Sequence, residues 1–367
     1  MTQGDKPFPK PFIVPIFVPH MGCPHQCVFC NQTSITGSDP DDVLGSITRR
    51  IKEVHGEIAH RCSRDFFDNP KGRQVAFYDG SFTGIDKEVQ ATLLSAVHPL
   101  IRRGLIDSIR VSTRPDYIDP QALALLKTYG VRTVELGVQS MVEEVLRRSR
   151  RGHTPDDVLQ AVDMLHGGGF KVGIQIMVGL PGDDMGRNAY TVDRVIKLNP
   201  HFVRIYPTLV LKGTPLEGLY RSGRYTPLSL EEAVDICKKA FLRFHRAGIP
   251  VIRLGLQSSP ELETTDCVLA GPYHAAFGHL VKSSLFYDMA SHLMGKYRQY
   301  RNVRVKVSPS DVSNIRGQKN QNLHQLKERF GLRDIQIEAD EGQPRGSLIL
   351  INGKRLDGIS YQTLPLS

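Results

Sequence analysis

The segment Gly22-Cys23-Pro-His-Gln-Cys27-Val-Phe-Cys30 places three cysteines in the spacing C-x3-C-x2-C. Three thiolates on one short loop can bind three irons of a [4Fe–4S] cluster. The chain has six cysteines, and the other three lie far from this loop and from each other in the sequence. The spacing therefore predicts a cluster whose fourth iron is open to a reacting molecule. A structural zinc site completed by His20 or His25 is the alternative.

The composition predicts an ordinary globular protein. The 367 residues, 40% hydrophobic and 23% charged, are enough for one large α/β domain and a smaller one. Residues 1–10 lack the apolar core of a signal peptide, and no apolar run reaches the length of a membrane span. Clustered cysteines without a disulfide pattern favour metal binding in a reducing compartment. We therefore expect a cytoplasmic protein without a membrane partner.

Working outward from the cysteines, short β-rich runs alternate with helical segments. The expected strands are Phe12–Val18, Gln74–Tyr78, Ser108–Ser112, Thr133–Val138, Lys171–Val178 and Phe202–Pro207, with Val251–Gln257 as a further candidate. The expected helices include Asp41–His60, Lys87–Arg103, Pro120–Tyr129, Pro155–Gly167 and Leu230–Ala247. Six strand–helix units predict a parallel sheet that curls into a partial (β/α)6 barrel over residues 11–257.

A second pattern follows the barrel. Residues 258–300 are expected to form a helical connector. Residues 301–353 then show strand, helix, helix, strand and strand, at Val303–Val307, Ser310–Ile315, Gln321–Phe330, Asp334–Glu338 and Ser347–Ile351. This β-α-α-β-β order predicts a small domain of its own.

Parallel barrels carry their chemistry at the carboxyl ends of the strands. In this chain the unusual residues fall at those ends, behind the cysteines that follow the first strand. They are Asp79-Gly80-Ser81-Phe82-Thr83-Gly84, Ser112-Thr-Arg-Pro-Asp116, Gly137-Val-Gln-Ser140, Gln175 before the turn Gly179–Gly182, and Arg204-Ile-Tyr206-Pro. Because these residues, like the cysteines, all fall at the ends of strands, the sequence predicts that they form one site.

Together with Phe29 before the last cysteine, these motifs resemble the radical S-adenosylmethionine (SAM) superfamily. Within it, the chain resembles the catalytic subunit of Elongator and its bacterial relatives over roughly residues 15–257. The matching segments are Tyr78–Gly84, Thr113–Tyr117, Val134–Ser140, Arg151–Thr154, Val203–Val210 and Lys212–Thr214. The resemblance implies a [4Fe–4S] cluster that binds SAM at its open iron and generates a 5′-deoxyadenosyl radical. It also implies an electron donor such as flavodoxin or ferredoxin.

The resemblance assigns roles residue by residue. Cys23, Cys27 and Cys30 would bind the cluster, and backbone groups of Gly80 and Ser81 would meet the amino end of the methionine moiety. Arg151 would hold its carboxylate. Gln139, Gln175 and Tyr206 are the remaining candidates for the cofactor site, with a core role as the alternative for Tyr206.

The sequence also departs from the family in three places. Asp79 replaces a glycine and Ser112 replaces a glutamate found in some relatives. The Elongator subunit carries an acetyltransferase domain, whereas the roughly 110 residues after this barrel show a different pattern.

The C-terminal pattern resembles a KH domain, whose Gly-x-x-Gly loop clamps nucleic-acid backbone. Here the loop is Gly317-Gln-Lys319-Asn320, with Arg316 before it. Residues 296–333 hold ten basic residues against two acidic ones, which suggests a polyanion partner. We therefore expect Arg316, Gly317 and Lys319 to bind RNA, with tRNA as the candidate. A small-molecule substrate such as a porphyrinogen, and an RNA-binding protein with a structural or sensory cluster, remain as alternatives.

Overall fold

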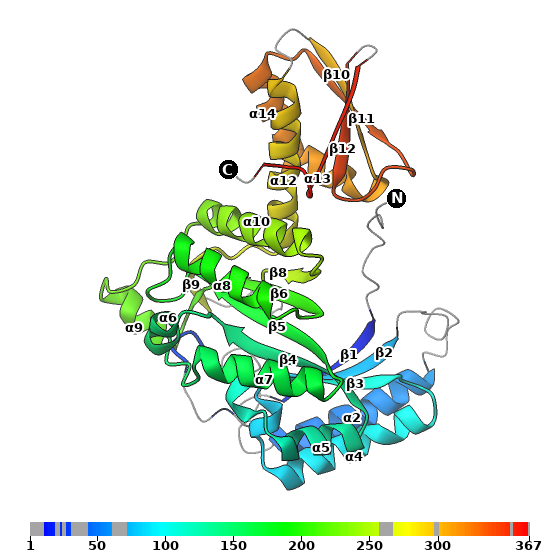
Figure 1. The fold of residues 1–367 in the computed structure, drawn as a ribbon, viewed down its shortest axis with the longest axis vertical. Helices are drawn as coiled ribbons and strands as arrows, with labels where there is room; N and C mark the ends of the chain where they lie inside the picture. Colours follow the sequence, from blue (N-terminus) through cyan, green and yellow to red (C-terminus); the bar gives the residue numbers. More distant parts are fainter. Residues whose placement is uncertain are drawn as a thin grey trace.

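The computed structural model describes residues 11–18, 23, 27–30, 43–60, 72–256, 267–296, 301–352 and 355–365. Its larger part is a parallel sheet that curves into a partial barrel (Figure 1). Seven strands follow in the order β1-β2-β3-β4-β5-β6-β8, and they are Phe12–Phe17, Arg73–Tyr78, Ser108–Thr113, Val131–Gln139, Lys171–Val178, Phe202–Pro207 and Val251–Leu254. The predicted partial barrel is thus confirmed, and the candidate seventh strand joins it as β8, parallel to β6.

Helices cover the outer face of this sheet, where the core lies. They are α2 (Val43–His60), α4 (Lys87–Arg102), α5 (Pro120–Thr128), α7 (Pro155–Gly167), α8 (Met185–Lys197) and α10 (Leu230–Arg246). Two short helices, α6 (Glu143–Arg148) and α9 (Pro215–Arg221), lie outside this core, and α9 packs against Val28 and β7 (Val210–Leu211). Alternate strand residues such as Val134, Leu136 and Val138 are fully buried in this core. The intervening residues therefore face the concave side of the sheet, the barrel lumen.

Helix starts agree with the local sequence. The Thr154 hydroxyl accepts from the Asp157 N–H, and the Asp157 carboxylate accepts in return from the Thr154 N–H, which makes a capping box before Pro155. Ser229 and Glu232 repeat this arrangement at the start of α10. These caps fix the points at which the chain leaves the site loops and enters the outer helices.

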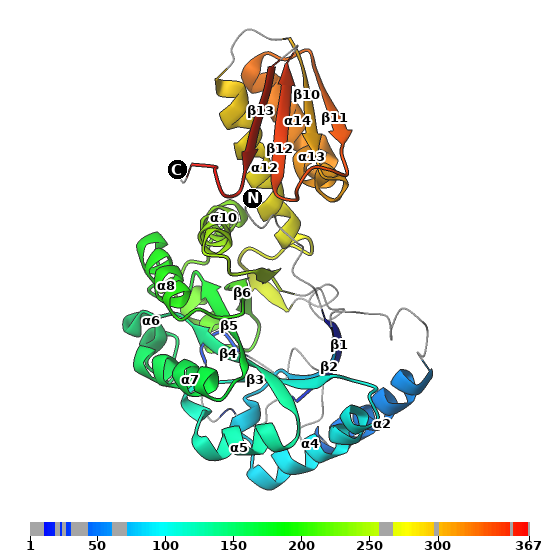
Figure 2. The ribbon, with the colours of Figure 1, turned by 45° about the vertical axis from the view of Figure 1, so that its right-hand side comes forward.

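The C-terminal domain is a four-stranded sheet in the order β11-β10-β12-β13, with helices packed on one face (Figure 2). Its elements are β10 (Asn302–Val307), α13 (Val312–Arg316), α14 (Gln321–Phe330), β11 (Asp334–Ala339), β12 (Ser347–Asn352) and β13 (Arg355–Ser360). Strands β10 and β11 are parallel, and the other neighbours are antiparallel. The predicted β-α-α-β-β order is present, and β13 extends the sheet beyond the expected limit at residue 353.

Between the two sheets, the expected helical connector contains α12 (Phe277–Gly295) and also a short strand, β9 (Val268–Ala270), which pairs with β7 (Val210–Leu211). Helix α12 is buried on both sides because it packs against α10 and against the C-terminal sheet. The Tyr361 ring lies against the rings of Phe241, His245 and Phe286. A shared apolar core therefore joins the C-terminal domain to the barrel. No helix in the described ranges is long and apolar enough to cross a membrane.

Candidate active site

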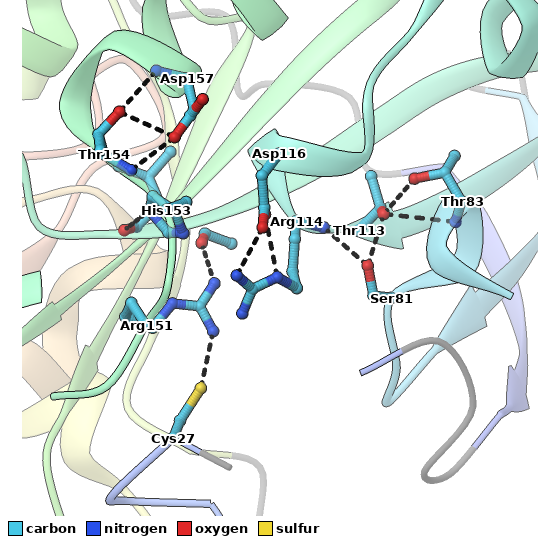
Figure 3. A network of polar contacts seen from close by, with 12 residues as sticks. Cys27, Ser81, Thr83, Thr113, Arg114, Asp116, Arg151, His153, Thr154 and Asp157 are labelled. Atoms are coloured by element: carbon cyan, nitrogen blue, oxygen red, sulfur yellow. Dashed lines mark hydrogen bonds and ion pairs between the residues drawn. The ribbon is translucent and has the colours of Figure 1, made fainter. Parts of the chain in front are cut away.

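The candidate site lies at the carboxyl edge of the barrel, where loops after β1, β2, β3 and β4 meet (Figure 3). Figure 3 shows Cys27 from the first loop facing Arg151, and Arg114 with Asp116 beside them. Parallel strands bring these loops to one edge although the residues are far apart in sequence. The predicted convergence is therefore seen for the cysteine loop, the Ser81 loop and the Arg151 segment.

The three cysteines lie close enough to affect one another. Burial, then the neighbouring thiols Cys27 and Cys23, raises the pKa of Cys30 to about 12. Burial and Cys27 also raise the pKa of Cys23, while Arg151 and Arg114 act in the opposite direction. Thiolates packed this closely repel each other, so binding of a positively charged metal group would release their protons.

Arg151 connects the cysteine loop to β4. Its Nη1 donates to Cys27 Sγ at 3.2 Å and its Nη2 donates to the Gly137 carbonyl at 2.6 Å. Its Nε is buried without a hydrogen-bond partner among the described residues, as is Oε1 of Gln139. A Cβ at Gly137 would lie 3.0 Å from Gln139 Nε2 and 3.4 Å from Arg151 Nη2, so glycine is needed for both side chains to approach.

The Ser81 loop is tied to β3 by hydroxyl groups. Thr113 Oγ1 lies 3.0 Å from Ser81 Oγ and 2.5 Å from Thr83 Oγ1, and Ser81 Oγ accepts from the Arg114 N–H at 3.2 Å. A hydrogen bond from the Ser81 backbone favours the Cys23 thiolate and so acts to lower its pKa, against burial. The Gly80–Ser81 turn is therefore held against the cysteine loop.

Arg114 and His153 complete the network. Arg114 forms a two-point ion pair with Asp116, with N···O distances of 2.9 and 2.7 Å. His153 Nε2 lies 3.2 Å from the Val138 carbonyl, and burial lowers the pKa of His153 to about 3. His153 is thus neutral at pH 7, and its Nδ1 is another buried atom without a partner in the described part of the chain.

Backbone strain gathers at the same edge. Asp79, Gln139 and Arg150 have φ values of 66°, 67° and 53°, in the left-handed region that non-glycine residues rarely adopt. Asp79 thus takes up the conformation that a glycine would adopt there, which explains how aspartate is accommodated in the motif. The β4–β5 pairing is irregular between Gly137 and Gln139, a kind of bulge common beside active sites.

Inside the lumen, Glu135 is 2% exposed and accepts from two arginines. Arg110 Nη1 and Arg204 Nη1 each lie 2.9 Å from its carboxylate, and the Tyr78 hydroxyl lies 3.3 Å away. Tyr206 belongs to this group, with its ring 5.3 Å from the Arg204 guanidinium. Glu135 is thus a buried carboxylate paired with two bases.

The predicted site residues therefore divide between two neighbouring groups. The cysteines, Ser81, Gln139 and Arg151 lie at the edge, whereas Tyr206 lies beside Arg204 in the lumen. Gln175 is opposite Gly137 on one side and Arg204 on the other, so it stands between the groups. Arg110 was not predicted. Arg114 and His153 lie inside the predicted segments Thr113–Tyr117 and Arg151–Thr154, but neither was assigned to the cofactor site.

The residues at the edge fit an amino-acid-bearing nucleotide bound to an iron–sulfur cluster. Three thiols are the donors that such a cluster requires. The Arg151 Nε–H is a free donor for a carboxylate, and Gln139 Oε1 is a free acceptor for a hydroxyl. Within the described residues, no three His, Cys, Asp or Glu side chains are arranged to bind a single ion. His20 and His25, which the zinc alternative needs, lie outside those residues.

The predicted RNA-binding loop joins α13 and α14. Gly317, Lys319 and Asn320 have φ values of 71°, 48° and 62°, and Arg316 and Lys319 are exposed. Other basic residues of this domain are paired: Lys306 with Glu338 and Asp340, and Lys327 with Asp334. The positive surface is thus narrower than the charge of residues 296–333 suggested.

The chain is similar to known proteins of one family. The Radical SAM superfamily model matches residues 17–195, and the Radical_SAM C-terminal domain model matches residues 200–286. A tRNA uridine(34) acetyltransferase of Methanocaldococcus jannaschii is 36% identical over 59% of this chain and 46% of that protein. Elongator complex protein 3 of Schizosaccharomyces pombe is also 36% identical, with the same coverage. The chain thus spans less than half the length of these two curated relatives.

An uncharacterized protein of M. jannaschii is 28% identical over 69% of this chain and 77% of that protein. Among solved structures, the archaeal Methanocaldococcus infernus Elp3 with an N-terminal deletion has a TM-score of 0.54. It is 20% identical over 75% of this chain and 63% of that chain, which supports a shared fold. The two family models together cover most of the chain, and proteins of this family use a [4Fe–4S] cluster and SAM. The chain belongs to the radical SAM superfamily, and it is an enzyme of that class.

Proposed function

We propose that this enzyme modifies tRNA. The observation that carries the proposal is the combination, in one chain, of a barrel similar to proteins named tRNA uridine(34) acetyltransferase and a C-terminal domain with an exposed basic loop. Two arguments support it further. Lys319 and Asn320 of this loop have positive φ values and are exposed, and a shared core joins this domain to the barrel.

The residues at the barrel edge have distinct roles in this proposal. Cys23, Cys27 and Cys30 hold the cluster, and Arg151 binds the carboxylate of SAM through its free Nε–H. Gln139 accepts from a ribose hydroxyl, while Gly80 and Ser81 meet the amino group. When bound, the cluster and SAM supply a radical that removes a hydrogen atom from the substrate.

Two of the predicted site residues lie in the barrel lumen, below this edge. Gln175 and Tyr206 face the concave side of the sheet, where they border the space next to the cofactor. The Phe202 ring fills the room left by Gly173, because a Cβ there would come within 2.2 Å of it. The Arg110 guanidinium stacks on the same ring at 4.8 Å. In this proposal, the packed ring and guanidinium help to exclude water from the lumen.

The loop between the helices would bind the RNA backbone. Arg316 and Lys319 are exposed, and the Arg316 guanidinium lies 3.4 Å from Asn320 Oδ1. Asn320 replaces the second glycine of the KH motif while adopting the φ that glycine would have. Lys319 projects from the tip and contacts phosphate as a point charge.

Binding of bulk tRNA tests the substrate class. The protein should bind tRNA with an affinity that falls steeply between 50 and 200 mM salt, because phosphate contacts release counterions. Lys319→Glu should weaken binding about tenfold or more and reduce the salt dependence. Lys197→Glu, a reversal of an exposed lysine at the end of α8, is the matched control and should bind as the wild type does. Unchanged affinity in Lys319→Glu would count against the loop.

Product analysis tests the reaction. Anaerobically reconstituted protein with SAM and a reductant should form 5′-deoxyadenosine, and tRNA should increase its yield. Mass spectrometry of tRNA nucleosides from a deletion strain should then show one modification missing. A full set of nucleosides, together with 5′-deoxyadenosine formation that ignores tRNA, would indicate a small-molecule substrate instead.

A further inference from the structure

A surface cavity of about 270 Å³ opens next to the cysteine loop, between the end of α6 and helix α9. Its lining includes Val28 of the cysteine loop, Leu219 of α9 and three arginines, Arg148, Arg150 and Arg224. Val28 lies between Cys27 and Cys30 in the sequence. The cavity therefore borders the segment that carries two of the cluster ligands.

Hydrogen bonds hold this wall firmly in place. The Val28 N–H donates to the Ser149 carbonyl at 3.1 Å, and the Val28 carbonyl accepts from the Leu216 N–H at 2.8 Å. The Val28 side chain packs with Val210, Leu216 and Tyr225. The cluster loop is thus clamped between α9 and the segment that follows α6, and the arginines surround the outer side of the clamp.

The charge of this surface is positive. Arg148 shares the carboxylate of Glu144 with Arg147. Within the described part of the chain, neither Arg150 nor Arg224 forms an ion pair, and the Arg224 guanidinium donates to the Ser222 hydroxyl at 3.0 Å. Two guanidinium groups are therefore available for an acidic partner.

Arg150 also carries backbone strain. Its φ of 53° would suit glycine or asparagine better, and Gly152 beside it has a φ of 78°. A long charged side chain in this conformation costs stability, and its placement beside the cavity points to a use for the charge.

We propose that Arg148, Arg150 and Arg224 form the docking surface for an acidic electron-carrier protein. In this step a reduced carrier, containing flavin mononucleotide or an iron–sulfur centre, loses one electron, and the [4Fe–4S] cluster gains it. The inference follows from the cluster site and does not depend on tRNA being the substrate. Opposite charges at such a surface steer association and raise its rate by 10- to 1,000-fold.

RNA is the competing occupant, because phosphates also bind arginines. Figure 1 places α6 and α9 away from the C-terminal domain that carries the basic loop, and Figure 2 shows the same for α6. The loop that holds the cluster ligands forms one wall of the cavity. An electron carrier must bind close to the cluster, whereas an RNA phosphate need not. We therefore favour the carrier.

The test uses the reconstituted enzyme with reduced flavodoxin, and in parallel with reduced ferredoxin, as probes. Arg150→Asn combined with Arg224→Gln removes two charges and places asparagine where the backbone favours it. At low salt, the rate of cluster reduction by at least one carrier should fall about tenfold or more. Reduction by photoreduced deazaflavin, a small diffusible reductant, should be unchanged. Lys197→Gln, with one exposed charge removed from α8, should behave as the wild type does.

Binding of each carrier to the protein, measured by isothermal titration at two salt concentrations, provides a readout that does not depend on turnover. The double variant should lose most of the salt-dependent affinity. Unchanged rates and affinities for both carriers would overturn the proposal. So would loss of tRNA binding with unchanged reduction by the carriers, since the surface would then bind RNA. A loss of tRNA modification with intact carrier binding would leave this inference standing and refute only the proposed substrate.

Discussion

Replacing Glu135 by glutamine should destabilise the barrel severely. The carboxylate is 2% exposed and lies 2.9 Å from both Arg110 and Arg204. The side chains of these arginines are 6% and 19% exposed. Glutamine keeps the shape but removes the charge, and its amide nitrogen would face guanidinium donors. Two positive groups would then remain in the lumen without compensation.

A more exposed glutamate in the same protein provides a control for the size of the expected destabilisation. Glu144 also accepts from two arginines, Arg147 and Arg148, both at 2.5 Å, but its side chain is 32% exposed and theirs are 72% and 54% exposed. Breaking a buried ion pair by removing one partner costs about 3–5 kcal/mol. Exposed pairs contribute about 0–1 kcal/mol. The two glutamates thus differ mainly in burial.

Urea unfolding of Glu135→Gln and Glu144→Gln, followed by circular dichroism, measures the difference. We expect a loss of about 3–5 kcal/mol for the first variant, equivalent to a fall in Tm of about 6–20 °C for a domain of this size. For the second we expect about 1 kcal/mol or less. Adding Arg204→Met to Glu135→Gln should recover part of the loss. Equal stability of the two single variants would refute the reasoning that burial decides the cost.

Three further outcomes are expected. Cys30→Ser should remove the visible absorbance and the iron of the anaerobically reconstituted protein while leaving its circular dichroism unchanged; full iron content would exclude it as a ligand. Because burial lowers the pKa of His153 to about 3, the unfolded chain takes up the proton first, and stability should fall by about 1.4 kcal/mol per pH unit below pH 6.5. His153→Gln should lack this component, and identical pH profiles would contradict it. Gly317→Ala should cost about 1–2 kcal/mol, since φ is 71° and the new Cβ would lie 3.0 Å from the Asn322 side chain. Gly56→Ala, with open space in helix α2, should instead be neutral or stabilising in the same urea assay.

The barrel could be predicted because its signals are local. The strands Lys171–Val178 and Phe202–Pro207 have the predicted bounds, since continuous β-branched and apolar runs are typical of strands buried in a parallel sheet. The strands that were not predicted have weak local signals and depend on the strands with which they pair. β9 has three residues and exists through pairing with β7, while β13 contains Gly358 and gains its strand conformation from β12.

For the site, the sequence predicted which loops at the strand ends come together, but not which side chains contact each other. The cysteine spacing and the motif positions show which loops meet. They do not show that Arg110 and Arg204, on strands β3 and β6, both reach Glu135 on β4, because that depends on sheet register and curvature. Period-two alternation places Glu135 on one face with Gly137 and Gln139, without saying whether that face is the lumen.

Charge counting had a similar limit. The basic segment 296–333 ends one residue before Asp334, and the parallel pairing of β10 with β11 then places Lys306 opposite Glu338. The lysine donates to that carboxylate at 3.1 Å. Counting charges along the sequence therefore overstated the extent of the positive surface. Arg316 and Lys319 remain exposed at the loop.

Backbone strain is a feature that the candidate active site and the basic loop share. Among the described residues, six non-glycine residues have positive φ, and Asp79, Gln139 and Arg150 surround the cysteine loop, whereas Lys319 and Asn320 form the basic loop. The sixth, Asn199, follows helix α8 and is of the type that tolerates this conformation at helix ends. Glycine at the other positions would relieve strain of about 1 kcal/mol each. A glutamine, an arginine and a lysine at such positions therefore argue that their side chains serve binding, which is where the cofactor, carrier and RNA proposals each place them.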